Sequence, residues 1–176
     1  MSYQSPGVQP MYVPTYNYAS WIQRVGAYIV DQLVGLASFI PAGIGIVLLI
    51  AGSDITSHTD YDGTEVIDHW SLNALAVVGI VVIVLGSIFA IVFAFWNIVF
   101  RQGRTGASIG KSAMGLVLLN ESTGRPVGAG MSFVRQLAHI IDGMICYLGY
   151  LWPLWDTKRQ TIADKCVSSV VVRTKG

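Results

Sequence analysis

The chain has 176 residues, of which 53% are hydrophobic and only 12% are charged. A soluble domain carries roughly 25% charged residues, so this composition excludes a typical water-soluble globule and predicts a membrane protein of one compact domain. The formal net charge of +1 gives no overall field of the kind that marks nucleic-acid-binding proteins. We therefore expect the lipid bilayer, and no nucleic acid, as a partner.

Residues 1–19 contain three prolines, four tyrosines and no charged residue. This composition predicts a disordered N-terminal tail with extended character. The tail has no basic region followed by an apolar core, so we expect no signal peptide. The predicted membrane domain covers residues 20–176.

The first long apolar segment covers residues 21–50, which exceeds the about 20 residues that cross a hydrocarbon core. Pro41 lies inside this segment and predicts a kink in the helix. Arg24 and Asp31 lie near its start, seven residues apart, which places both on one helical face. An aspartate inside a membrane helix is costly and persists where it has a partner or a function.

The next segments differ sharply in charge. Residues 51–70 form a predicted polar loop with five acidic residues and no Lys or Arg, and residues 71–100 form an uncharged, predicted transmembrane helix. Residues 101–130 carry four basic residues and one acidic residue. The positive-inside rule therefore places the N-terminus and the 101–130 loop in the cytoplasm and the 51–70 loop outside.

The third apolar segment, residues 131–155, contains Arg135, His139 and Asp142 on one helical face. Only thirteen uncharged residues follow Asp142 before the next charge, which is short of a full crossing. The C-terminal tail is rich in Lys and Arg, which favours the cytoplasm. We therefore expect a short or re-entrant helical hairpin, with three ordinary crossings and an external tail as the alternative.

Two short β segments complete the predicted fold. Residues 115–127 read as a small hairpin, and residues 168–173 as a strand that pairs with it. This pairing requires both segments on one side of the membrane. The predicted fold class is thus an all-α membrane protein with two long transmembrane helices, a third short or re-entrant segment and a small cytoplasmic β element.

The charges of the first and third apolar segments repeat one pattern. The spacing from Arg24 to Asp31 recurs from Arg135 to Asp142, with an alanine and an isoleucine at matching offsets. Pairing within a helix prefers a separation of three or four residues, so each charge is expected to find its partner on another segment. We expect a cluster in which Arg24 lies near Asp142 or Asp164, and Arg135 near Asp31.

The sequence resembles the RDD family of bacterial membrane proteins, which is named for one arginine and two aspartates. The resemblance rests on Arg24, Asp31, Gly103–Lys111, Gly115–Val117, Gln160–Lys165 and Val170–Val172, and extends from Ala19 to Arg173. It implies a multi-pass protein of the inner membrane, with Asp164 as the second aspartate and Asp142 as the other candidate. It also implies transport of an unidentified ligand, or exchange of cations for protons.

The candidate residues of an ion, proton or charge-cluster site are Arg24, Asp31, Arg135, His139, Asp142 and Asp164. Carboxylates beside arginine, and a histidine that titrates near neutrality, suit a small transporter or a cation/proton exchanger. The alternative is an accessory or assembly subunit whose Arg–Asp pairs are structural. We expect no enzyme activity, cofactor or metal, and we expect a homo-oligomer or a larger membrane complex.

Overall fold

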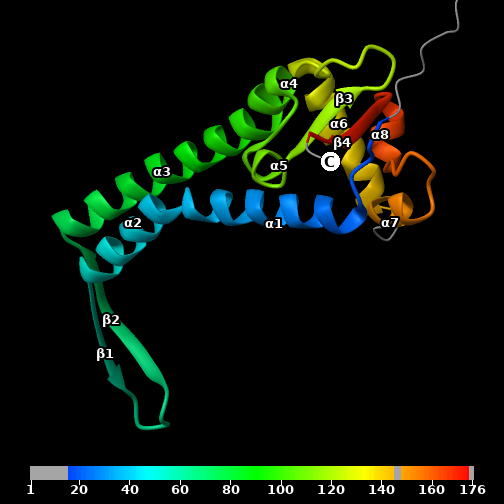
Figure 1. Cartoon of the computed structure of the whole chain (residues 1–176). Coiled ribbons are helices and arrows are strands. Elements are labelled where there is room, and N and C mark those ends of the chain that lie inside the picture. Colours follow the sequence, from blue (N-terminus) through cyan, green and yellow to red (C-terminus); the bar gives the residue numbers. More distant parts are fainter. Residues whose placement is uncertain (1–15, 145–147, 175–176) are drawn as a thin grey trace, which may run out of the picture.

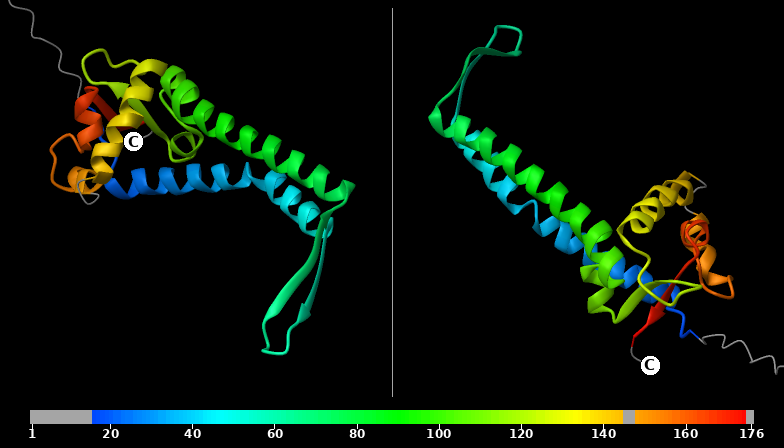
Figure 2. Two further views of the ribbon diagram at one scale, coloured as in Figure 1. Left: turned by 180° about the vertical axis from the view of Figure 1, so that it is seen from behind. Right: turned by 90° about the horizontal axis from the view of Figure 1, so that it is seen from above.

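The computed structural model describes residues 16–144 and 148–174. Two long helical arms join at one end and diverge toward the other, where the short helices and a small sheet gather (Figure 1). A β-hairpin extends away from the joined end, as the two views of Figure 2 also show. Most of the tail predicted for residues 1–19 lies outside the described residues.

The first arm consists of α1 (Trp21–Ala37) and α2 (Ile40–Ala51). Ser20 and Gln23 form a capping box at the start of α1. The break lies at residues 38–39, and Pro41 occupies the first turn of α2, where its missing N–H costs no helical hydrogen bond. The kink predicted for this segment is therefore confirmed. The two helices together form a candidate membrane span.

The second arm runs from α3 (Ala74–Phe95) through the π-helical turn η1 (Trp96–Arg101) into α4 (Gln102–Thr105). It is the second helix in the described part of the chain that is long and apolar enough to cross a membrane. The arms pack closely because glycines face each other. A Cβ on Gly45 would lie 2.6 Å from the backbone nitrogen of Ile83, and one on Gly86 would lie 2.6 Å from that of Ala42.

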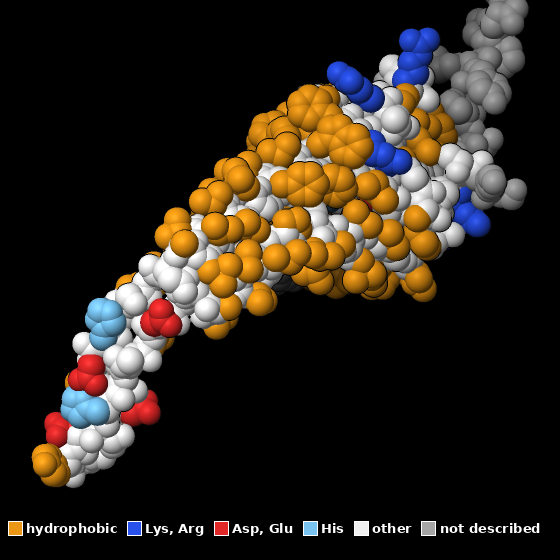
Figure 3. Space-filling view, turned by 90° about the vertical axis from the view of Figure 1, so that its left-hand side faces the viewer, with side chains coloured by type: hydrophobic (Ala, Val, Ile, Leu, Met, Phe, Trp, Pro, Cys, Tyr) orange, Lys and Arg blue, Asp and Glu red, His pale blue; other side chains and the backbone are white. Residues whose placement is uncertain are grey.

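The segment predicted as a polar loop at 51–70 is a β-hairpin, so that prediction was wrong. Strands β1 (Ser53–Thr59) and β2 (Glu65–Leu72) pair antiparallel, with Ile55 opposite Trp70. The acidic residues favoured a loop in the prediction, although β-branched and aromatic residues, which favour strands, flank the turn. Figure 3 shows acidic and histidine side chains on this hairpin, apolar side chains over the helices, and Lys and Arg at the opposite end.

The third apolar segment is bent. Helix α6 (Ala129–Met144) and the α7–η2 piece (Leu148–Leu151 and Trp152–Leu154) lie at 106° to each other, on either side of residues 145–147, which the structure does not describe. This bend agrees with the hairpin expected at 131–155. Whether the segment crosses the membrane stays a prediction.

The remaining elements form a small compact layer at the diverging end of the arms. They are α5 (Ile109–Ala113), β3 (Leu116–Asn120), α8 (Ile162–Cys166) and β4 (Ser169–Arg173). The predicted pairing is confirmed, because β3 and β4 are antiparallel. The chain before α1 joins the other edge of β4 through a bridge from Tyr18 to Val172. The protein is therefore mostly helical, as predicted, with the expected β3–β4 element and a second small sheet, β1–β2, that the predicted fold class did not include.

Candidate functional site

Asp164, at the N-terminal turn of α8, holds two arginines from different helices. Arg24 Nη1 donates to Asp164 Oδ2 at 2.6 Å, and Arg135 Nε donates to Oδ1 at 2.8 Å. The Thr161 backbone N–H and the Ser169 hydroxyl also donate to this carboxylate. Burial alone would raise the pKa of Asp164, but the arginines outweigh it and hold that pKa well below its usual range. Asp164 therefore ties α1, α6 and α8 together as a carboxylate.

Asp31, two turns along α1 from Arg24, is held by neutral donors. Asn97 Nδ2, Ser108 Oγ and the Gly110 backbone N–H lie at 2.9, 2.6 and 2.8 Å from its oxygens. A Cβ on Gly110 would lie 2.0 Å from the Ala27 carbonyl oxygen, so only glycine lets α5 approach α1 this closely. Asp31 thus joins α1, η1 and α5.

The expected cluster of four charges does not form. Arg24 does pair with Asp164 on another segment, as predicted. The prediction that Arg135 lies near Asp31 was wrong, because Arg135 binds Asp164 instead. The physical reason is that α5 folds between the arms and satisfies Asp31 with hydrogen-bond donors that carry no charge.

His139 and Asp142 form a separate pair on α6. His139 Nδ1 lies 2.7 Å from Asp142 Oδ2, and the histidine ring stacks on Tyr150 with 5.3 Å between ring centroids. Asp142 is fully buried. A Cβ on Gly149 would lie 2.1 Å from Asp142 Oδ1. This pair therefore closes α6 against α7 and does not join the arginines.

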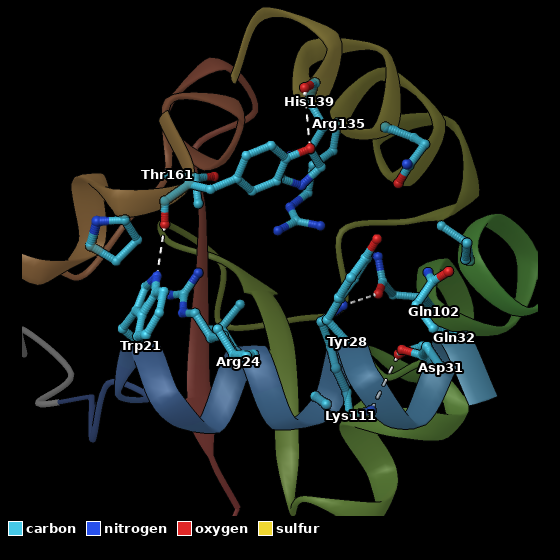
Figure 4. A pocket seen from close by; sticks show the side chains of 18 residues that line it. Trp21, Arg24, Tyr28, Asp31, Gln32, Gln102, Lys111, Arg135, His139 and Thr161 are labelled. Atoms are coloured by element: carbon cyan, nitrogen blue, oxygen red, sulfur yellow. Dashed lines mark hydrogen bonds between the residues drawn. The ribbon is translucent and has the colours of Figure 1, made fainter. Parts of the chain in front are cut away.

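A cavity of about 550 Å³ lies between α1, η1, α5, α6 and α7 (Figure 4). Its polar lining includes Arg24, Asp31, Lys111, Arg135, His139 and Thr161. Figure 4 shows the side chains of Arg24 and Arg135 extending from opposite helices toward its interior. Arg24 Nε and Nη2 are buried there and have no hydrogen-bond partner among the described residues.

Lys111 and Gln102 are cavity residues that the sequence did not single out. Lys111 Nζ donates to Gln102 Oε1, and both side chains line the cavity. Burial of the ammonium group, with a smaller effect of Arg135, lowers the pKa of Lys111 to about 7. Asn97 was also missed, although an amide within an uncharged membrane helix signals a hydrogen-bonded contact.

Comparison with known proteins shows which family the sequence matches. The RDD family model matches residues 18–168. The chain is 40% identical over 163 residues to the proline-rich antigen homolog of Mycobacterium tuberculosis, covering 91% of this chain and 65% of that protein. It is 37% identical over 158 residues to the proline-rich antigen of Mycobacterium leprae, covering 90% of this chain and 62% of that protein.

The chain thus spans less than two thirds of the length of these relatives. No solved structure matches it. The family match covers both long arms, the charged residues Arg24, Asp31 and Asp164, and the residues that line the cavity, apart from Val171. This chain belongs to the RDD family.

Proposed function

We propose that this membrane protein binds an anionic solute in the cavity between α1 and α6, as a transporter that binds and releases its ligand without catalysis. The observation that carries the proposal is the pair of unpartnered nitrogens on Arg24, Nε and Nη2, at a buried position on the cavity wall. A buried donor without a partner is costly. Oxygens of an anionic ligand would satisfy both donors at once, since the guanidinium presents them as a fork.

The balance of charge also supports an anion. Arg24 and Arg135 share the single carboxylate of Asp164, so this cluster has one excess positive charge. Lys111 and Asp31 also line this cavity, so their opposite charges add no net charge to the excess. An anion bound between the two arginines would neutralise the excess, and low polarity around the site would strengthen the attraction.

A cation/proton exchanger has less support. Such an exchanger needs a carboxylate with free oxygens. Asp31 accepts three hydrogen bonds and Asp164 accepts four from protein groups. Asp142 is not part of the cavity lining. Of the two transport functions expected from the sequence, the geometry therefore supports transport of a ligand, which we propose is an anion, over exchange of cations for protons.

We also propose that the end of the molecule that carries the Lys and Arg side chains lies in the cytoplasm. The N-terminal end of α1, the β3–β4 sheet and α8 all lie at this end, and the β1–β2 hairpin lies at the other (Figure 1). Residues 51–73 contain no Lys or Arg. The positive-inside rule supports this orientation and a location in the inner membrane.

A second candidate function is that of an accessory or assembly subunit. The hairpin extends past the ends of the helices, and Ile55, Ile67 and Trp70 on it are 60%, 66% and 64% exposed. A two-stranded hairpin is marginally stable by itself, so these side chains suit contact with another protein. Loss of a co-purifying protein when Ile67 and Trp70 are replaced by serine would favour this function.

The test of anion binding uses the purified protein in detergent, with inorganic phosphate and glycerol 3-phosphate as probes in calorimetric titrations. Arg24→Lys keeps a cation for Asp164 but removes the two free donors. We expect it to weaken probe binding by about tenfold or more. The matched control is Arg104→Lys, since Arg104 is exposed and does not line the cavity. Equal binding by wild type and Arg24→Lys would contradict the proposal.

A further inference from the structure

We infer that the anionic ligand is the head group of a phospholipid, which reaches the cavity sideways from the bilayer through a mouth between α1 and α6. This inference rests on the proposed function and names the class of its ligand. The head group would meet the cationic residues, and the acyl chains would stay along the apolar outer faces of the two helices. The argument depends on which lining residues are exposed and on what flanks them.

The mouth is formed by cavity residues whose side chains are also exposed. Tyr28 and Gln32 on α1, Gln136 on α6 and Tyr150 on α7 line the cavity, and all four are exposed at the surface. In Figure 4, Tyr28 and Gln32 extend from α1 beside Asp31. The cavity is therefore open on the side where α1 and α6 face each other.

On α1, the mouth residues lie between the charged face and the apolar face. Each residue advances a helix by about 100°. Tyr28 is therefore close in angle to Arg24, one turn before it, while Ile29 follows on the outer side. Ile29 and Leu36 are exposed, at 51% and 70%.

Helix α6 repeats this order. Arg135 and His139 face the cavity, and Gln136 lies next to them at the edge. Beyond Gln136 in angle come Leu137 and Ile140, which are 49% and 58% exposed. Exposed apolar side chains of this size on candidate membrane segments face lipid. Both sides of the mouth are therefore bordered by surface that acyl chains can cover.

The depth of the cations also fits a lipid head group. Arg24 lies in the first turn of the 31-residue candidate span Trp21–Ala51. Trp21 lies at the start of that span, and its Nε1 donates to the Tyr150 carbonyl oxygen at 2.9 Å. Tryptophan at a helix end marks the membrane–water interface. Basic pockets between membrane helices near that interface bind anionic head groups.

The inner wall of the cavity is partly apolar. Val25, Ala27 and Ile98 contribute apolar surface beside the arginines. A free phosphate would leave this surface exposed to water, whereas the glycerol and first carbons of a lipid would cover it. A phosphate ester with attached chains is therefore a better match than a small soluble anion.

The test compares three probes on the purified protein in detergent: short-chain phosphatidic acid, phosphatidylcholine of the same chain length, and glycerol 3-phosphate. Native mass spectrometry measures the fraction of protein that retains each lipid, and calorimetry measures binding of all three. We expect phosphatidic acid to bind at least about tenfold more tightly than either of the other two. Arg24→Lys should remove most of that preference.

A second variant tests the lateral entry of the lipid separately from its recognition by the cationic residues. Gln136→Trp narrows the mouth at an exposed position and leaves every cation in place. We expect it to weaken binding of phosphatidic acid much more than binding of glycerol 3-phosphate, because only the lipid must keep its chains in the mouth. Arg104→Gln is the control for a general loss of positive charge, and it should behave as wild type.

The outcomes distinguish this inference from the proposed function. If glycerol 3-phosphate binds as tightly as phosphatidic acid, or if Gln136→Trp retains the lipid as wild type does, lateral access by a lipid is wrong and anion binding stands. If phosphatidylcholine is retained equally, the head group is not recognised and the inference fails. If no phosphate probe binds, both proposals fail.

Discussion

Removing the negative charge at Asp164 tests the central contact of the fold. Asp164→Asn keeps the size of the side chain but leaves Arg24 and Arg135 without their shared counterion. Asp164 is fully buried, and the side chains of the two arginines are only 12% and 8% exposed. Water could then reach the two guanidinium groups only through the cavity, and it would not replace the lost carboxylate charge.

The expected loss in free energy of unfolding follows from this burial. Removing one partner of a buried ion pair costs about 3–5 kcal/mol. Here two cations depend on one carboxylate, so we expect the upper end of that range. The amide oxygen of asparagine still accepts one hydrogen bond, and its NH₂ group faces an arginine that has no acceptor. A loss of this size is comparable to the whole stability of many domains.

The assay measures membrane abundance of tagged protein and thermal unfolding in detergent. The matched control is Glu121→Gln, which removes the carboxylate from a partly exposed ion pair with Lys158. The side chains of Lys158 and Glu121 are 46% and 31% exposed. Such a pair contributes about 0–1 kcal/mol. A combined Asp164→Asn, Arg135→Gln variant should recover part of the loss. If Asp164→Asn unfolds as the control does, the assignment of Asp164 as the joint between α1, α6 and α8 is wrong.

Two further predictions concern α5. Gly110→Ala would place a methyl group 2.0 Å from a backbone carbonyl oxygen of α1; we expect a loss of about 1–3 kcal/mol in detergent unfolding, whereas Gly130→Ala, with nothing within 4 Å, should be neutral. The contribution of Lys111 to binding of the phosphate probes should fall as the pH rises through about 7, because its lowered pKa makes it lose its proton there. Lys111→Arg stays protonated and should flatten that pH dependence, and an unchanged profile in this variant would exclude Lys111 as its source.

The two long arms could be predicted from the sequence because hydrophobicity over more than twenty residues is a strong local signal. The pairing of β3 with β4 could be predicted because β3 is a short apolar run followed by turn residues and β4 is a short run of valines. The partner of Arg24 could be narrowed to another segment by helical spacing alone. These features depend on nearby residues in the chain.

The site was harder to predict because its contacts join distant segments. Asp31 and Gly110 are 79 positions apart, and a backbone N–H gives no sequence signal as a ligand of a carboxylate. The repeat of Arg24–Asp31 in Arg135–Asp142 suggested mutual pairing, but equal depth in the membrane does not place two side chains in contact. The cavity itself is lined by residues of α1, η1, α5, α6 and α7, which hydropathy does not bring together.

The guanidinium of Arg24 supplies more at this position than a positive charge. The guanidinium uses Nη1 for Asp164 and still has Nε and Nη2 for a ligand, whereas lysine has one nitrogen and would commit it to the carboxylate. Asp164 fixes the orientation of this fork, and Asp31 holds α5 so that Lys111 lies on the same cavity. Asp31 and Asp164 thus hold the helices around the cavity, and Arg24 binds Asp164 while two of its nitrogens remain without a partner among the described residues.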